Sequence, residues 1–152
     1  MNVVINYWAV LASAVASMVI GSIWFGPLFG KMYISLMGMD KKTPEEQAAM
    51  SAGGGSASGG KKGMAMTYVW QFIASLVMFY VLAHVTELSQ NFFHYSNVKT
   101  GLTTAFWVWL GFIVPVMLGG ALWGGKMKLF WLGIGNMLVT LLVGGLIIGM
   151  MK

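Results

Sequence analysis

The residues that could do chemistry inside the apolar part of this sequence are few and uncharged. They are two amides and two hydroxyls, Gln71, Ser75, Asn136 and Thr140. A polar side chain within a bilayer either hydrogen-bonds a neighbouring helix or lines a path for a polar solute. The bonding role is the commoner one. Gln71, Ser75 and Asn136 are therefore candidates for a polar pathway, with helix packing as the competing interpretation.

Carboxylates are missing from the long apolar runs. A small proton-coupled exporter needs an acid within the bilayer that alternates between a proton and a cationic substrate. His84 and Glu87 lie three residues apart, but at the end of an apolar run, where we expect the membrane interface. Because no acid, base or nucleophile pair falls at membrane depth, we predict no catalytic residues and no enzyme activity.

Metal and cofactor sites are not predicted either. The chain has 14 methionines, whose thioethers are soft ligands, but no cysteine. Both histidines, His84 and His94, are expected on the opposite side of the membrane from the methionine cluster at 32–39. No zinc spacing and no glycine-rich phosphate loop occurs. We therefore expect neither a metal nor another cofactor.

Small residues recur at four-residue intervals in two places. The first run carries a stripe of small residues, and the last run carries a GxxxG pair; the residues are Ala9, Ser13, Ser17 and Gly21, and Gly145 and Gly149. Such stripes let two helix backbones approach closely, and serine hydroxyls can bond across the contact. They predict either a dimerisation face or packing within the bundle.

Composition shows which environment must hold these residues. Of 152 residues, 58% are hydrophobic and 9% are charged, whereas a soluble domain carries roughly 25% charged residues. This composition excludes a soluble enzyme, a disordered chain and a nucleic-acid binder, despite the net charge of +5. Four apolar runs of about 20 residues each match the thickness of a bilayer core. They predict transmembrane helices over 3–25, 64–85, 103–122 and 129–151.

Lysine placement predicts the topology. Seven lysines lie in the segments between runs one and two and between runs three and four, against two on the other side. The excess of positive charge marks cytoplasmic loops, so we expect both termini outside, in a bacterial inner (plasma) membrane. Tryptophans at the predicted cytoplasmic ends fit interfacial belts; they are Trp24, Trp70, Trp123 and Trp131.

The connections differ in character. Residues 30–37 predict a short interfacial helix, and 38–62 a flexible cytoplasmic loop. Within that loop, 53–60 is a Gly/Ser stretch typical of either an added linker or a natural loop. We expect a polar outer loop over 86–100. Pro115 should free the carbonyl of Gly111 and kink its helix, as a hinge or as a packing device.

Two stretches resemble each other. Residues 21–26, ending in Trp24-Phe25-Gly26, are echoed by 120–125, ending in Trp123-Gly124-Gly125. The echo suggests two parallel helical-hairpin repeats about an axis along the membrane normal. Glycine and tryptophan at helix ends are also common in unrelated membrane proteins, so both interpretations stay open.

Three segments carry recognisable motifs: Gly-Ser-Ile-Trp-Phe-Gly-Pro-Leu-Phe-Gly-Lys at 21–31, Lys-Gly-Met at 62–64 with Tyr68 and 72–78, and Thr-Gly at 100–101 with 105–112. Together these segments resemble the domain of unknown function 1761 family. The resemblance implies a small bacterial four-helix membrane protein without an established activity. Members often carry an acid after the third helix's tryptophan, whereas this chain has Gly124 there.

These observations predict an all-α integral membrane bundle of four transmembrane helices, as a single domain. The leading functional hypothesis is a non-enzymatic protein that acts through helix association, as a homo-oligomer or with another membrane protein. The alternative is a small-molecule transporter or channel subunit with a polar spot at Gln71 and Asn136. The expected partners are the lipid bilayer and other membrane proteins, with no nucleic acid.

Overall fold

The computed structural model describes residues 4–38, 60–93 and 96–152, and these residues are helical apart from short turns and end segments, without a strand. The all-α prediction is thereby confirmed. Most of the predicted loop at 38–62, including nearly all of its Gly/Ser stretch, lies outside the described residues. The elements in chain order are α1 (Tyr7–Ile23), η1 (Trp24–Leu28), α2 (Gly30–Leu36), α4 (Gly60–Phe93), α5 (Asn97–Val108), η2 (Trp109–Ile113), α6 (Val114–Gly124) and α7 (Met127–Met150).

Four helical stretches are long and apolar enough to cross a membrane. They cover Tyr7–Leu28, Ala65–Phe92, Asn97–Gly124 and Met127–Met150, with 22, 28, 28 and 24 residues. About 20 residues suffice at 1.5 Å per residue. The four predicted spans are therefore present, and the second and third are longer than their apolar runs.

The polar outer loop expected over 86–100 is mostly helix instead. Helix α4 continues to Phe93, and α5 begins at Asn97. The segment between Thr86 and Lys99 contains no glycine or proline to end a helix. Polarity alone does not stop a helix where it leaves the apolar region, because its exposed side chains then meet water. Charge and polarity therefore marked the membrane boundary there, not the helix boundary.

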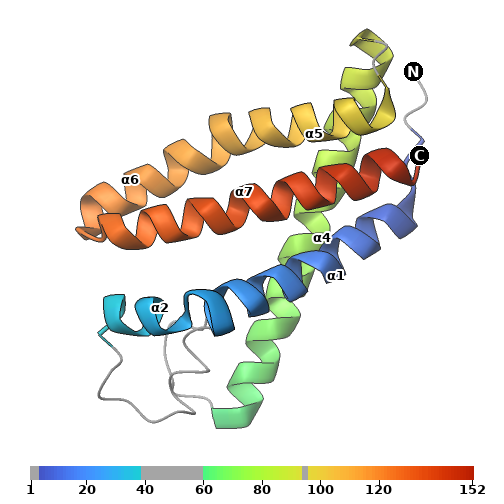
Figure 1. Cartoon of the computed structure of the whole chain (residues 1–152). Coiled ribbons are helices and arrows are strands. Elements are labelled where there is room, and N and C mark those ends of the chain that lie inside the picture. Colours follow the sequence, from blue (N-terminus) through green and yellow to red (C-terminus); the bar gives the residue numbers. More distant parts are fainter. Residues whose placement is uncertain (1–3, 39–59, 94–95) are drawn as a thin grey trace.

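Helix α7 is the centre of the bundle. It contacts α1 on one side and α5 and α6 on the other, with further contacts to α4 and α2 (Figure 1). In the most apolar 18-residue stretch of α7, half of the residues are buried. In the corresponding stretch of the span made by α5, η2 and α6, only 11% are buried. The main core holds Phe79, Leu82, Leu141 and Ile148, together with alanines of α1 and α5.

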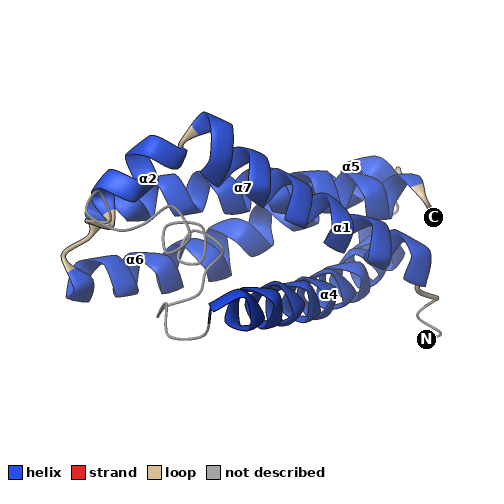
Figure 2. Ribbon diagram, turned by 90° about the horizontal axis from the view of Figure 1, so that it is seen from below, coloured by secondary structure: helices blue, strands red, loops and turns tan. Residues whose placement is uncertain are grey.

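Helix α4 crosses the other spans obliquely, and in the view from below it lies along one side of them (Figures 1 and 2). Its second half makes the core contacts, through Phe79, Leu82 and Ala83. Its first half is largely exposed; Tyr68 and Trp70 are examples. Among the described residues, one apolar face in the first half of α4 has no packed neighbour.

The start of α1 and the end of α7 lie at the same end of the bundle (Figure 1). Asn6 fixes this arrangement, since its Nδ2 donates to the Met151 carbonyl at 2.6 Å. Its Oδ1 also caps α1, accepting from the Trp8 N–H at 3.0 Å. The opposite end carries α2 and the turn between α6 and α7.

The short helix predicted over 30–37 is present as α2. It packs close to η1 because Gly30 has no Cβ; an added Cβ would lie 2.8 Å from the Phe25 carbonyl oxygen. The rings of Phe25 and Tyr33 then meet edge to face at 5.0 Å. Partial burial raises the pKa of the Tyr33 phenol above its ordinary value.

Candidate functional site

The small-residue stripe of α1 packs inside the bundle over its first half. Ala9 and Ser13 are buried, while Ser17 and Gly21 are half-buried. The Ser13 hydroxyl lies 2.8 Å from the Ala9 carbonyl and 3.3 Å from the Gly144 carbonyl of α7, so it bonds across the helix contact. This part of the stripe is therefore occupied by α7.

The GxxxG pair of α7 is in contact with α5. A Cβ on Gly145 would lie 2.5 Å from the Gly101 carbonyl oxygen, and one on Gly149 would lie 2.6 Å from the Asn97 carbonyl oxygen. Contacts to backbone atoms at this distance are open only to glycine. Gly145 and Gly149 thus bring two spans of the same chain together.

A second GxxxG pair, Gly120 and Gly124 in α6, has no such neighbour. Within the described part of the chain, a Cβ on either residue would meet nothing within 4 Å, and both glycines are exposed. Val116, one turn before Gly120, is 75% exposed. The sequence analysis did not single out this pair, although its spacing is the same as that of the pair in α7. What distinguishes the two pairs is their surroundings, which spacing does not reveal.

Two tryptophans hold α7 from opposite sides. Trp24 begins η1 and Trp109 begins η2. Their indole N–H groups donate to the α7 carbonyls of Leu132 at 3.2 Å and Ile134 at 3.0 Å, respectively. Trp24 is therefore half-buried and bonded, not simply a belt residue as predicted. Trp70, Trp123 and Trp131, by contrast, are all exposed.

Trp24 and Trp109 also each begin a wide helical turn. The Phe29 N–H donates to the Trp24 carbonyl at 2.9 Å, and the Val114 N–H donates to the Trp109 carbonyl. Both bonds span five residues, the pattern of a π-helix, which is rare and often marks functional sites. The irregularity expected from Pro115 therefore takes the form of a π turn that ends two residues before it.

Polar groups in the middle of α7 are buried without partners. Asn136 and Thr140 are 6% and 5% exposed, and Asn136 Nδ2 and Thr140 Oγ1 have no hydrogen-bond partner among the described residues. The two residues are one turn apart and near the middle of the 24-residue helix. A buried, unpaired polar group costs about 1–3 kcal/mol.

The other two pathway candidates lie on α4 and differ from Asn136. Ser75 is buried, and its hydroxyl donates to the Gln71 carbonyl at 2.9 Å. Gln71 is exposed, next to the exposed Trp70. No hydrogen bond joins the side chains of Gln71 and Asn136 in the described part of the chain. The predicted polar spot is thus not assembled from these two amides by direct bonding.

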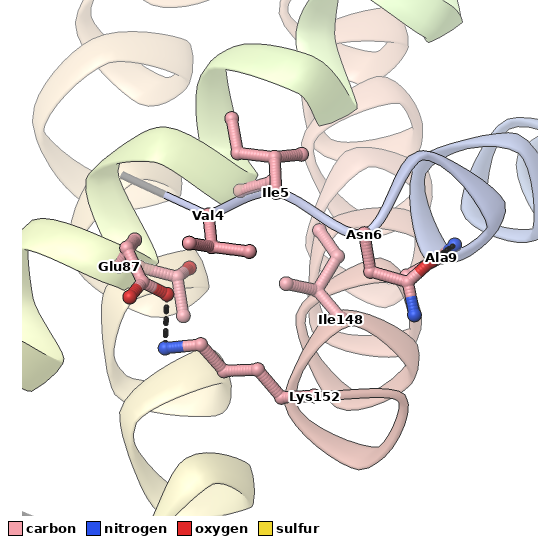
Figure 3. A pocket seen from close by; sticks show the side chains of 9 residues that line it. Val4, Ile5, Asn6, Ala9, Glu87, Ile148 and Lys152 are labelled. Carbon is pink, nitrogen blue, oxygen red and sulfur yellow. Dashed lines mark hydrogen bonds and ion pairs between the residues drawn. The ribbon is translucent and has the colours of Figure 1, made fainter. Parts of the chain in front are cut away.

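Charged groups gather where α4 ends and α7 ends. Lys152 forms an ion pair with Glu87 and also bonds Gln90, which in turn bonds Asn97 of α5. His84, one turn before Leu88 on α4, bonds the Tyr80 carbonyl at 3.0 Å through Nδ1. The bonds of Lys152, Gln90 and Asn97 link α4, α5 and the end of α7. Glu87 and Lys152 also line a small pocket (Figure 3).

Three apolar spans packed around a fourth, the glycine-rich helix α7, with the described charges at the bundle ends, define an α-helical multi-span membrane protein. The chain belongs to the family described as Protein of unknown function (DUF1761), whose model matches residues 8–149. The predicted family resemblance is thereby confirmed. Neither the curated proteins nor the solved structures gave a match.

Proposed function

We propose that this chain is a non-enzymatic membrane protein that acts by lateral association, with the exposed face of α6 as the interface. The observation that carries the proposal is the contrast between the GxxxG pair of α7 and the GxxxG pair of α6. Gly145 and Gly149 pack directly against the backbone of α5, whereas Gly120 and Gly124 have no neighbour among the described residues. We therefore do not place the interface on α1, because the first half of its small-residue stripe already packs against α7.

The physical argument rests on what glycine contributes in lipid. Lipid tails are as apolar as leucine, so helices associate through close packing and hydrogen bonds rather than through a hydrophobic driving force. Glycine in a helix interior costs about 1 kcal/mol relative to alanine. Gly120, in the interior of α6, carries that cost without a contact from the described residues to offset it. An approaching helix would supply the contact, and a second copy of this chain is the occupant we propose.

The non-enzymatic part of the proposal is supported by the placement of titratable groups. Glu87 is the one side-chain carboxylate within the described residues, and it is paired with Lys152 at the end of the bundle. The described residues contain no group of three or more His, Asp or Glu side chains that could hold a metal ion. Among the described residues, the hydroxyls of Ser13 and Ser75 bond backbone carbonyls and not a side-chain base.

A cysteine cross-linking experiment tests the α6 interface. The chain has no native cysteine, so Val116→Cys introduces a single thiol on the proposed face. Oxidation in native membranes should give a disulfide-linked dimer, and adding Gly120→Ile should abolish it. Val77→Cys is the matched control, since Val77 is 59% exposed near the middle of α4. Equal cross-linking at both positions would refute the interface. A disulfide-linked product between this chain and a different protein would show that the partner is that protein and not a second copy of this chain.

We also propose a bacterial inner (plasma) membrane location, with the start of α1 and the end of α7 outside. Lys126 and Lys128 lie at the start of α7, at the end of the bundle that also holds Lys31 of α2. This grouping agrees with the excess of lysines that predicts cytoplasmic loops at that end. Impermeant thiol reagents should label Ser96→Cys from outside intact cells and should leave Ser58→Cys unlabelled. The reverse labelling pattern would overturn this orientation.

A second candidate function is a small-molecule transporter or channel subunit. The observation in its favour is the pair of unpartnered polar atoms, Asn136 Nδ2 and Thr140 Oγ1, in the middle of α7. Flux through proteoliposomes should then fall in Asn136→Leu. Flux that is the same in Asn136→Leu and in the unaltered chain would remove Asn136 from any pathway.

A further inference from the structure

The end of the bundle that holds α2 and the turn between α6 and α7 gathers positive charge. Lys31 is the second residue of α2, and Lys126 and Lys128 lie at the start of α7. Because α2 packs against α7, these three lysines share one end of the molecule although they are far apart in the sequence (Figure 1). All three side chains are exposed.

No acidic side chain within the described residues neutralises this end. Glu87 is the one side-chain carboxylate there, and it pairs with Lys152 at the opposite end of the bundle. In the sequence, the two segments that join span one to span two and span three to span four hold seven lysines and three acidic residues. The lysine end therefore carries a net positive charge.

Exposed tryptophans place the lysines at the depth of lipid headgroups. Trp123 and Trp131 lie on either side of the turn between α6 and α7, and both are exposed. Trp131 follows Lys128 by three residues within α7, and residues at this spacing are neighbours on a helix surface. Tryptophan rings favour the membrane–water interface. The ammonium group of Lys128 can therefore reach the phosphate layer beside the Trp131 ring.

We propose that Lys31, Lys126 and Lys128 form a binding surface for the headgroups of anionic phospholipids. Charge complementarity selects this occupant, because clustered lysines beside a transmembrane helix attract anionic lipids. At headgroup depth, a phospholipid presents its phosphate to the lysines while its acyl chains lie along the apolar spans. The proposal depends neither on the α6 interface nor on which side of the membrane this end faces.

Site-specific quenching in phosphatidylcholine vesicles tests the surface. A dye at Ser35→Cys, an exposed site in α2, reports the lysine end, and a dye at Ser96→Cys, also exposed, is the control at the opposite end. The quencher is a nitroxide near the top of an acyl chain, carried by phosphatidylglycerol or by phosphatidylcholine at the same mole fraction. Phosphatidylglycerol should quench the Ser35→Cys dye at least about fivefold more strongly, the effect of one lysine at about 1 kcal/mol. The two lipids should quench the Ser96→Cys dye equally.

A charge variant and added salt test the cause of this preference. Lys128→Gln should lower the preference for phosphatidylglycerol at Ser35→Cys about fivefold, whereas the matched variant Lys99→Gln, at the opposite end, should leave it unchanged. In the dye-labelled chain without a lysine substitution, sodium chloride at about 1 M should also lower the preference, since it shortens the Debye length to about 3 Å. Inorganic phosphate should lower it no more than sodium chloride of the same ionic strength, because the free ion has no acyl chains.

Equal quenching of the Ser35→Cys dye by the two lipids would overturn the proposal. The same preference for phosphatidylglycerol at Ser35→Cys and Ser96→Cys would do so too, since it would show no local binding. A preference that survives both Lys128→Gln and high salt would remove the lysines as its cause. Displacement by inorganic phosphate beyond the effect of salt would identify the ligand as a free anion and not a lipid.

Discussion

Adding one methyl group at Gly145 should separate two spans of the bundle. In Gly145→Ala the new Cβ would lie 2.5 Å from the Gly101 carbonyl oxygen and 2.8 Å from the Ala105 Cβ. Ordinary contact begins at 3.4 Å, so the oxygen contact must lengthen by about 0.9 Å. A backbone carbonyl cannot rotate away as a side chain can. The variant must therefore move α5 relative to α7.

The expected cost follows from two opposing effects. Overpacking a close-packed interior costs about 1–3 kcal/mol, and alanine regains about 1 kcal/mol of helix propensity over glycine. Because the clash is with backbone, we expect the upper part of the overpacking range. The free energy of unfolding of Gly145→Ala should therefore fall by about 1–2 kcal/mol.

Titration of micelle-bound protein with a denaturing detergent, followed by far-UV circular dichroism, measures this change. The matched control is Gly120→Ala, since a Cβ there meets nothing within 4 Å. Its stability should stay unchanged or rise by up to about 1 kcal/mol. Destabilisation of both variants to the same extent would refute the reasoning, as would a stabilised Gly145→Ala.

Two further pairs of variants can be measured in the same titration. Trp109→Phe should lower the free energy of unfolding by about 0.5–1.5 kcal/mol, because it loses the bond to the Ile134 carbonyl. Trp123→Phe, at a residue 95% exposed, should leave it unchanged; equal losses would contradict the role of Trp109. Thr140→Val removes an unpartnered hydroxyl and should be neutral or stabilising, whereas Thr100→Val loses a bond and should destabilise by about 1 kcal/mol. A loss at Thr140→Val as large as that at Thr100→Val would show that Thr140 has a partner.

The sequence predicted the membrane class, the four spans and α2, because these depend on local composition. Twenty apolar residues cross a bilayer whatever they pack against, and the apolar residues Met32, Tyr33, Leu36 and Met37 fall on one face of a short helix. The helix ends were harder to predict. Beyond Thr86 the side chains become polar while the backbone stays helical, so a hydropathy boundary was mistaken for a structural one.

The site residues depended on tertiary contacts that no local pattern encodes. Trp24 and Trp70 both sit near the end of an apolar run, yet only Trp24 bonds α7. The two GxxxG pairs have the same spacing, but one is enclosed by α5 and the other is open. Gln71 and Asn136 likewise looked equivalent as amides in apolar runs, and their burial differs. Neighbouring helices decide each of these outcomes.

Energy transfer in lipid vesicles tests the association proposal most directly. Donor and acceptor dyes at Ser96→Cys, an exposed site in a cysteine-free chain, report dimers as the protein is diluted in lipid. We predict that transfer falls on dilution, and that Gly120→Ile with Gly124→Ile weakens association at least tenfold, about 1.4 kcal/mol. Gly21→Ile in the α1 stripe should leave the dilution curve unchanged. Transfer at the level of random proximity in the unaltered chain, or a curve that shifts with Gly21→Ile and not with the α6 substitutions, would contradict the account.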